Sequence, residues 1–336
     1  MSKILITGGT GFIGYHLAEK LAEKSNTVVI VDNFFRSELD QDMKKLLEDP
    51  NIELIKADLT NRDSWNSLGY GYDYVYHLAS INGTRLFYEI PFEVLSIGIT
   101  TSLYAIKWFR TLNNNPKAKI LYTSSNEAYA GAMEAFGKLP LPTPEDVPLV
   151  ISDPYNPRWS YAGQKLIGEL LFIHGSKAHN FRMSIVRPHN FYGPREGYEH
   201  VIPEIIERVK KQVDPFPING ADDTRSFCYI DDAVEAIIAV MESEKTDGGT
   251  YHIGTKEETV IRELIEKIFI IMKWKPKKLD VKNSPEGSVK RRLPHVSKIK
   301  AHTGWEAKIS LKEGLEKMIE WYMAHPHETP EKNLKK

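Results

Sequence analysis

The chain has 336 residues, enough for one large domain or two smaller ones. Its 41% hydrophobic and 26% charged residues predict a globular protein with a sizeable core, and its net charge of −1 gives no electrostatic support for nucleic-acid binding. The single cysteine, Cys228, excludes an internal disulfide framework and a cysteine-rich metal site, so we expect no metal.

The chain begins with a short apolar run that meets closely spaced glycines and then a helical pattern. Gly8, Gly11 and Gly14 have the spacing GxxGxxG, which indicates a strand, a tight turn and a helix N-terminus. The first two glycines let the backbone approach a pyrophosphate, and the third lets the helix pack close to the strand. Free N–H groups at the helix start then face the phosphates. The stretch therefore predicts a dinucleotide-binding turn.

The next apolar run, residues 27–31, ends at Asp32. An acidic side chain at a strand end about 20 residues past such glycines typically binds the ribose hydroxyls of the adenosine. It also repels a 2′-phosphate, so the cofactor predicted here is NAD and not NADP. Arg36 lies nearby in the sequence and would weaken that preference.

Strand-like apolar runs alternate with helical patterns through the first half of the chain. This alternation predicts an α/β fold, a Rossmann-type doubly wound parallel sheet with helices on both faces. Ligands of such sheets bind at the carboxyl ends of the strands. The expected strands are 52–56, 74–79, 119–123, 182–187 and 250–254, and the expected helices are 39–47, 91–112, 159–174 and 230–241.

The pattern loosens near Pro188, where prolines, glycines and short elements become frequent. We expect an NAD-binding domain at 1–187 with return segments near 226–256, and a smaller C-terminal substrate-binding domain at 188–325. Residues 326–336 are charged and contain proline, which predicts a frayed tail. No room for a signal peptide precedes the first strand and no apolar run is long enough to span a bilayer, so we expect a cytoplasmic protein without a membrane segment.

Tyr161 and Lys165 form a YxxxK motif on the expected helix 159–174. Residues four apart share a helix face, so the phenol and the ammonium point the same way. A close lysine and a positively charged nicotinamide both favour the phenolate of a tyrosine, whose free pKa is about 10. That phenolate can take a proton from a sugar hydroxyl while hydride leaves the same carbon. A surface tyrosine and lysine are the alternative, because the motif alone is frequent by chance.

Ser124 and Ser125 stand at the end of the expected strand 119–123. Hydroxyl groups at such a strand tip can share the proton of a substrate hydroxyl, although an ordinary polar turn has the same composition. The glycine turn, Asp32, the serines and the YxxxK motif occur together, which makes coincidence improbable.

With these motifs the chain resembles an extended short-chain dehydrogenase/reductase, of the NAD-dependent nucleotide-sugar epimerase/dehydratase family. The resemblance covers roughly residues 3–325 and is specific for the family but not for the substrate. It also rests on Asp58-Leu59, His77-Leu78-Ala79, residues 187–195 (RPHNFYGPR), residues 224–232 (TRSFCYIDD) and residues 251–254 (YHIG).

The resemblance implies roles for further residues. Ser125 and Tyr161 would handle the proton of the sugar hydroxyl, with Lys165 beside them. Besides the three glycines and Asp32, the cofactor site would comprise Phe12, Ile13, Asn33, Asp58, Leu59, Leu78, Ala79, Tyr161 and Lys165. The site for a nucleotide-diphosphate sugar would comprise Asn82, Arg85, Asn126, Asn190, Arg225 and Arg291. Arg292 is the alternative to Arg291, and Arg85 is equally consistent with a surface charge.

The implied chemistry is oxidation of the sugar at C4 by tightly held NAD. Reduction of the ketone from the other face would make the enzyme a 4-epimerase, which we place first on family frequency. Elimination, decarboxylation or simple release of the 4-keto product are the alternatives. Asn126 cannot act as a general acid, which disfavours dehydratases of the dTDP-glucose type. Glu127 is a candidate base for the C5 proton or a carboxylate that holds the loop.

An alternative hypothesis from another functional class is that the protein is a regulator that binds the cofactor but has lost catalytic activity. The presence of Ser125, Tyr161 and Lys165 argues against it. The resemblance also implies a homodimer or larger homo-oligomer that pairs through the helices 91–112 and 159–174.

Overall fold

The structure is a computed structural model that describes residues 1–111, 113–284 and 289–325. The predicted tail, 326–336, lies outside these residues, as does the last residue of the predicted helix 91–112.

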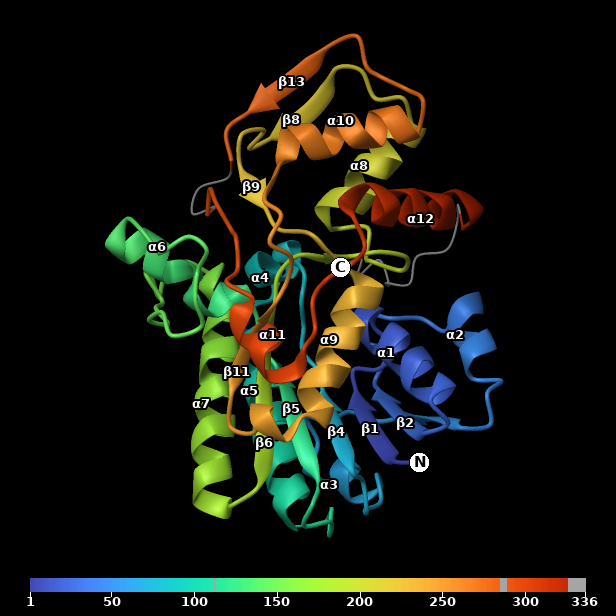
Figure 1. The fold of residues 1–336 in the computed structure, drawn as a ribbon, viewed down its shortest axis with the longest axis vertical. Helices are drawn as coiled ribbons and strands as arrows, with labels where there is room; N and C mark the ends of the chain where they lie inside the picture. Colours follow the sequence, from blue (N-terminus) through green and yellow to red (C-terminus); the bar gives the residue numbers. More distant parts are fainter. Residues whose placement is uncertain (112, 285–288, 326–336) are drawn as a thin grey trace.

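A seven-stranded parallel sheet forms the lower part of the molecule in Figure 1. Its order is β11-β6-β5-β4-β1-β2-β3, so the chain winds outward from β1 in one direction and from β4 in the other. This confirms the predicted Rossmann-type sheet, and it places a topological switch point between β1 and β4. The strands are β1 (Lys3–Thr7), β2 (Thr27–Asp32), β3 (Ile52–Lys56), β4 (Tyr74–His77), β5 (Lys119–Thr123), β6 (Arg182–Pro188) and β11 (Thr250–Ile253).

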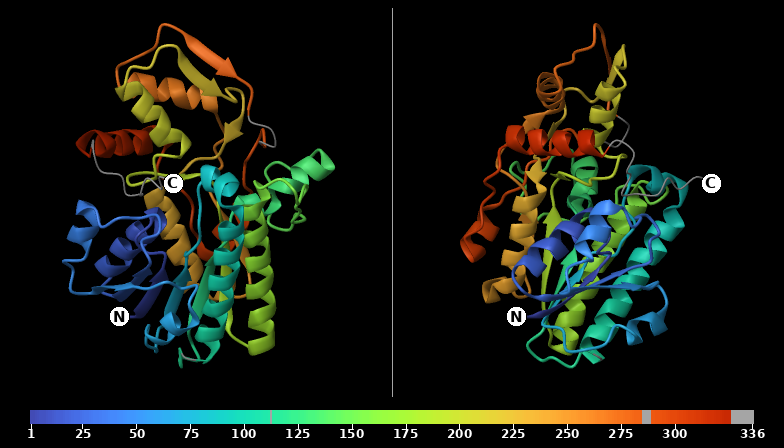
Figure 2. Two further views of the ribbon diagram at one scale, coloured as in Figure 1. Left: turned by 180° about the vertical axis from the view of Figure 1, so that it is seen from behind. Right: turned by 90° about the vertical axis from the view of Figure 1, so that its right-hand side faces the viewer.

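Helices cover both faces of this sheet, because its strands are apolar on both sides. Ile4 and Ile6 of β1 pack in one core with α1 (Phe12–Glu23) and α9 (Ile230–Glu242). Leu5 packs in a second core with α3 (Arg62–Asn66), α5 (Pro91–Thr111) and α7 (Trp159–His179). The right-hand view of Figure 2 shows the sheet between these two layers.

The upper part lies over the carboxyl ends of the strands (Figure 1). Three small sheets form there: β7 (Phe191–Tyr192) with β10 (Cys228–Tyr229), β9 (Thr224–Arg225) with β12 (Thr259–Val260), and β8 (Phe216–Asn219) with β13 (Leu279–Lys282). The helices of this part are α8 (Val201–Lys210), α10 (Ile261–Ile271) and α12 (Leu311–Ala324). The chain returns to the large sheet through α9, β11 and α11 (Ser297–Thr303). The expected return segments near 226–256 include α9 and β11 but not α11.

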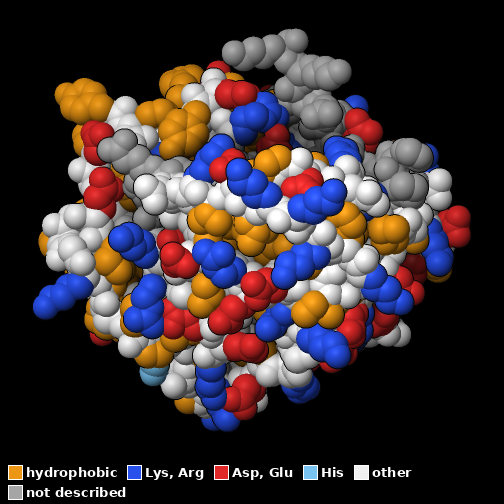
Figure 3. All heavy atoms as spheres, turned by 90° about the horizontal axis from the view of Figure 1, so that it is seen from above, with side chains coloured by type: hydrophobic (Ala, Val, Ile, Leu, Met, Phe, Trp, Pro, Cys, Tyr) orange, Lys and Arg blue, Asp and Glu red, His pale blue; other side chains and the backbone are white. Residues whose placement is uncertain are grey.

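Short elements complete the fold. α2 (Gln41–Leu46), α4 (Thr84–Glu89), α6 (Ala130–Phe136) and the 3-10 turn η1 (Asn126–Tyr129) lie around the edge between the two parts. A second 3-10 turn, η2 (Glu244–Thr246), follows α9 at the other end of the sheet, where Lys119 at the start of β5 donates to Thr246. Figure 3 looks down on the upper part and shows acidic and basic side chains intermixed. Among the described helices, none has both the length and the apolar character required to cross a bilayer.

Candidate functional site

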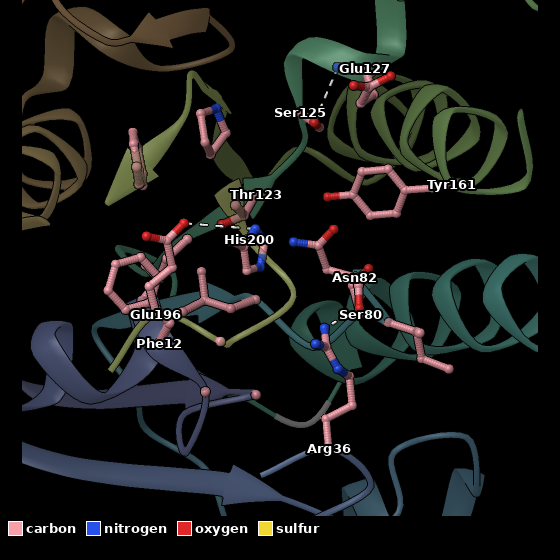
Figure 4. A pocket seen from close by; sticks show the side chains of 18 of the residues that line it. Phe12, Arg36, Ser80, Asn82, Thr123, Ser125, Glu127, Tyr161, Glu196 and His200 are labelled. Atoms are coloured by element: carbon pink, nitrogen blue, oxygen red, sulfur yellow. Dashed lines mark hydrogen bonds and ion pairs between the residues drawn. The ribbon is translucent and has the colours of Figure 1, made fainter. Parts of the chain in front are cut away.

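A cavity of about 590 Å³ opens at the carboxyl ends of the large sheet and reaches into the upper part. Its size lies within the usual range for a small-molecule site. Residues from both parts of the molecule line it, from Gly8 at the end of β1 to Arg225 in β9. Figure 4 shows its reactive end, where Ser125, Tyr161 and Asn82 face a common space.

Two of the three motif glycines, Gly8 and Gly14, have no room for a side chain. Gly8 has φ +70°, and a Cβ atom there would lie 2.9 Å from the Cα of Ala79. A Cβ on Gly14 would lie 2.5 Å from the Cα of Gly9. Helix α1 begins directly after Gly11, and both Gly11 and Phe12 line the cavity. The turn and the helix N-terminus therefore fit a dinucleotide pyrophosphate.

Asp32 ends β2 at the cavity wall. One carboxylate oxygen accepts from the backbone N–H of Phe34 at 2.8 Å and the other from that of Thr10 at 3.2 Å. These bonds fix the carboxylate beside the glycine turn, where adenosine ribose hydroxyls fit. The other predicted cofactor residues also line the cavity: Ile13, Asn33, Asp58, Leu59, Leu78, Ala79, Tyr161 and Lys165. Arg36 donates to the carbonyl of Asn82 at the far end of this wall.

Ser125 and Tyr161 point toward one another at the reactive end (Figure 4). The Ser125 hydroxyl accepts from the backbone N–H of Glu127 at 3.1 Å, and the Tyr161 ring stacks on Phe87. Burial raises the pKa of Tyr161 above its ordinary value, while a hydrogen bond with Ser125 acts in the opposite direction. The Lys165 ammonium lies 5.5 Å from the centre of the Tyr161 ring and donates to the carbonyl of Thr123 at 2.8 Å; that it favours the phenolate beside a bound nicotinamide stays a prediction.

Burial also acts on Lys165 itself, and it lowers the pKa of this lysine to about 7. Glu169 opposes the shift. Among the described residues, the hydroxyl of Thr123 next to it has no hydrogen-bond partner. A ligand with ribose hydroxyls would satisfy both groups.

Glu127 lies between two guanidinium groups at the same end of the cavity. Arg292 donates to one of its oxygens at 2.5 Å, and Arg158 lies 3.5 Å from the other. Burial alone would raise the pKa of Glu127, but Arg292, Arg158 and Arg225 together lower it. The carboxylate is therefore ionised near neutral pH. Sequence reasoning missed Arg158, although it stands three residues before Tyr161, a spacing that places both on one helix face.

The predicted substrate residues divide into two groups. Asn82, Asn126, Asn190 and Arg225 line the cavity, whereas Arg85 and Arg291 do not. Arg85 pairs with Glu89 and Glu199, and Arg291 pairs with Glu258. Arg292, the alternative to Arg291, lines the cavity.

Asn190 and Arg225 offer polar groups to a ligand. The buried side-chain oxygen of Asn190 has no partner among the described residues. Arg225 donates to two backbone carbonyls and lies 3.5 Å from Asp223. Burial and the neighbouring Arg292 lower the pKa of Arg225 to about 10, so it keeps its charge at neutral pH. A guanidinium in this position suits a diphosphate.

Comparisons with known proteins find relatives that match nearly the whole chain. The sequence profile of the NAD dependent epimerase/dehydratase family matches residues 4–254. A UDP-N-acetyl-alpha-D-glucosaminuronate decarboxylase of Bacillus cytotoxicus is 33% identical over 95% of this chain and 97% of its own. UDP-glucuronic acid decarboxylase 6 of Arabidopsis thaliana is 31% identical over 95% of this chain and 88% of its own. The crystal structure of a UDP-glucuronic acid 4-epimerase from Bacillus cereus, with UDP-glucuronic acid and NAD, has a TM-score of 0.84 at 26% identity, over 96% of this chain and 99% of its own.

Proposed function

The chain belongs to the NAD dependent epimerase/dehydratase family, and from this premise we propose that it decarboxylates a nucleotide sugar that carries a carboxylate on C5. It is an NAD-dependent enzyme whose nucleotide-sugar chemistry starts with oxidation at C4. The proposal concerns the fate of the 4-keto sugar and the roles of the residues around it.

The Glu127–Arg292–Arg158 cluster carries the proposal. Inversion at C4 needs a hydride acceptor and one group that takes and returns a proton, which Tyr161 and Ser125 supply. It needs no further charged group beside the sugar. A carboxylate held between two guanidinium groups suits a reaction that also moves charge at C5 and C6, because fixed charges stabilise such a step in a site shielded from water.

When bound, NAD accepts the hydride from C4 and later returns it. Tyr161 takes the proton of the C4 hydroxyl with the help of Ser125, which leaves a ketone beside the carbon that carries the carboxylate. Such a β-keto acid loses carbon dioxide when the C5–C6 bond breaks and its electrons move onto the C4 oxygen. Tyr161 and Ser125 donate to that oxygen. A proton from solvent replaces carbon dioxide at C5, and the ketone is then reduced.

The charges of the cluster fit this sequence of steps. Arg292 lines the cavity and attracts the sugar carboxylate, while Arg158 lies behind Glu127 and helps to keep it ionised. Glu127 repels the sugar carboxylate and so favours its departure as neutral carbon dioxide. The carboxamide of Asn126 is not acidic enough to protonate a leaving hydroxyl, which argues against dehydration of the dTDP-glucose type. The relatives from Bacillus cytotoxicus and Arabidopsis thaliana described above, 33% and 31% identical over 95% of this chain, are named as decarboxylases, which supports the same outcome.

A 4-epimerase is the second candidate, and the sequence alone placed it first. The solved structure that supports it holds a uronic acid substrate and NAD in a fold that superposes closely on this one. Both reactions share the 4-keto intermediate. In the decarboxylase the C5–C6 bond breaks before the hydride returns, whereas in the epimerase that bond stays intact and the hydride returns to the opposite face of C4.

The test is mass spectrometry of the products from UDP-glucuronic acid and UDP-N-acetylglucosaminuronic acid. We expect a product lighter by one carbon dioxide, and no mass change with UDP-glucose, which has no carboxylate. An unchanged mass with an inverted C4 would assign the protein as an epimerase. Loss of water would assign it as a dehydratase, and NAD binding without any turnover would support a regulator. The cytoplasmic location and the homodimer stay predictions.

A further inference from the structure

Loop 80–82, which follows β4, forms one wall of the reactive end of the cavity. Ser80, Ile81 and Asn82 all line the cavity, and Asn82 lies below the ring of Tyr161 in Figure 4. The position of this loop therefore sets the space in which the sugar meets the tyrosine. On one side, the guanidinium of Arg36 donates a hydrogen bond to the carbonyl of Asn82 in this loop.

On the other side, Gln164 of α7 forms hydrogen bonds with two residues of the same loop. Its side-chain N–H group donates to the Ser80 hydroxyl at 3.1 Å and to the Ile81 carbonyl at 3.3 Å. The Ser80 hydroxyl also lies 3.4 Å from the side-chain oxygen of Gln164 and can donate to it. Gln164 is 1% exposed and does not line the cavity itself. It stands between Tyr161 and Lys165 on one helix, so it ties the loop to the element that carries both reactive groups.

Gly98 of α5 makes room for this contact. A Cβ atom on Gly98 would lie 1.3 Å from the side-chain oxygen of Gln164 and 2.4 Å from its carboxamide carbon. The next contact is with the Cβ of Gln164 at 3.2 Å, which a shift of a few tenths of an ångström relieves. The glycine is thus required by the glutamine and not by the helix backbone.

We propose that Gln164 is a positioning residue, whose carboxamide fixes loop 80–82 and thereby sets the place of the sugar relative to Tyr161. The inference rests on the proposed nucleotide-sugar reaction, but the contacts that carry it are independent of the fate of the ketone. Loss of two side-chain hydrogen bonds to the loop should raise KM for the nucleotide sugar by about threefold to tenfold, and leave NAD binding unchanged.

The test compares Gln164→Ala, Gly98→Ala and the double variant, all with NAD bound. Gly98→Ala forces the carboxamide aside, whereas Gln164→Ala removes it and leaves a gap. In the double variant the new methyl group enters the vacated space. We expect the double variant to be less destabilised than the sum of the single variants, because they share one contact. We expect it to keep the raised KM and fast amide hydrogen exchange in residues 80–84.

Recovery of both KM and slow exchange in the double variant would overturn the proposal, because Gln164 would then only fill space. Slow exchange in Gln164→Ala would overturn it as well. If the wild-type protein converts no nucleotide sugar, the proposed function fails, while hydrogen exchange still decides whether Gln164 fixes the loop.

Discussion

Lys165 is placed where the proposed reaction uses it, but burying its ammonium group lowers the stability of the folded chain. Burial lowers its pKa to about 7 in the folded chain, whereas an unfolded lysine titrates at 10.5. The unfolded state therefore binds more protons than the folded state between these two values, and stability rises with pH across that window. Below about pH 7 the side chain is charged in both states, so the folded state bears the full free-energy cost of a buried ammonium.

Replacing Lys165 by methionine should therefore stabilise the protein in the absence of NAD. We expect the free energy of unfolding to rise by roughly 2–4 kcal/mol at pH 6, and the gain to shrink as the pH approaches 10. Denaturant unfolding of both proteins at several pH values measures it. The same variant should lose turnover. A gain that does not depend on pH would show that the methionine packs better and that the charge of Lys165 is not the cause.

Arg292 and Arg291 are adjacent in the sequence and differ in surroundings. Arg292 lines the cavity and binds Glu127, whereas Arg291 is more than half exposed and binds Glu258. We expect Arg292→Met to lower kcat/KM by about 30-fold or more, because it leaves Glu127 largely buried with one cation fewer. Arg291→Met, the matched control, should stay within about twofold, since exposed pairs contribute little. Steady-state kinetics with a UDP-uronic acid compares them, and equal losses would contradict the role of Arg292.

At the scale of elements, the sequence predicted helix α7 and the face that carries Tyr161 and Lys165. It did not predict which distant segments meet beside that helix. The four-residue spacing of Tyr161 and Lys165 is local, so the helix alone places both on one face. The strand ends that carry Gly8, Asp32 and Ser125 were likewise predictable, because parallel strands bring their carboxyl ends to one edge. The pairing of Glu127 with Arg292 joins segments 165 residues apart, and no local pattern encodes it.

Helix α4 and the segment after β7 meet at the cavity through an ion pair. Arg85 of α4 donates to Glu89 and, at 2.7 Å, to Glu199, which lines the cavity. Both side chains are about one-third exposed, so the pair should contribute at most about 1 kcal/mol.

Arg85→Ala should therefore raise KM for the nucleotide sugar by less than about fivefold and leave kcat unchanged. Lys256→Ala, which breaks an exposed pair with Glu306, is the matched control and should change neither constant. A loss of about 100-fold in kcat/KM for Arg85→Ala would instead mean that the arginine turns from Glu199 to bind the substrate, as the resemblance implied.

The whole molecule is built around a core that runs through both parts. One cluster of buried side chains includes Ile4 in the large sheet, Ile206 in α8 and Met318 in α12. Because this core is shared, we expect the lower and upper parts to unfold together. The cavity lies between the same two parts, so a ligand that contacts both should stabilise the chain as one unit.

UDP provides a test of this coupling, since it contains the nucleoside and the diphosphate but lacks the sugar that would react at C4. A ligand at about 100 times its Kd stabilises a protein by about 2.7 kcal/mol. We expect UDP and NAD each to raise Tm in a single transition. Arg225→Met should abolish the shift caused by UDP and keep that caused by NAD, because the guanidinium lies in the upper part of the cavity, away from the glycine turn.

Arg262→Met is the matched control, since this arginine is partly exposed and lies 3.8 Å from Asp222 outside the cavity lining. It should keep both shifts. Loss of the NAD shift in Arg225→Met would mean that the arginine supports the fold on which both ligands depend. Two separate transitions, of which UDP moves one and NAD the other, would mean that the shared core does not couple the two parts. A single transition whose Tm is raised by either ligand would show that the two parts unfold as one cooperative unit, which the binding of each ligand stabilises.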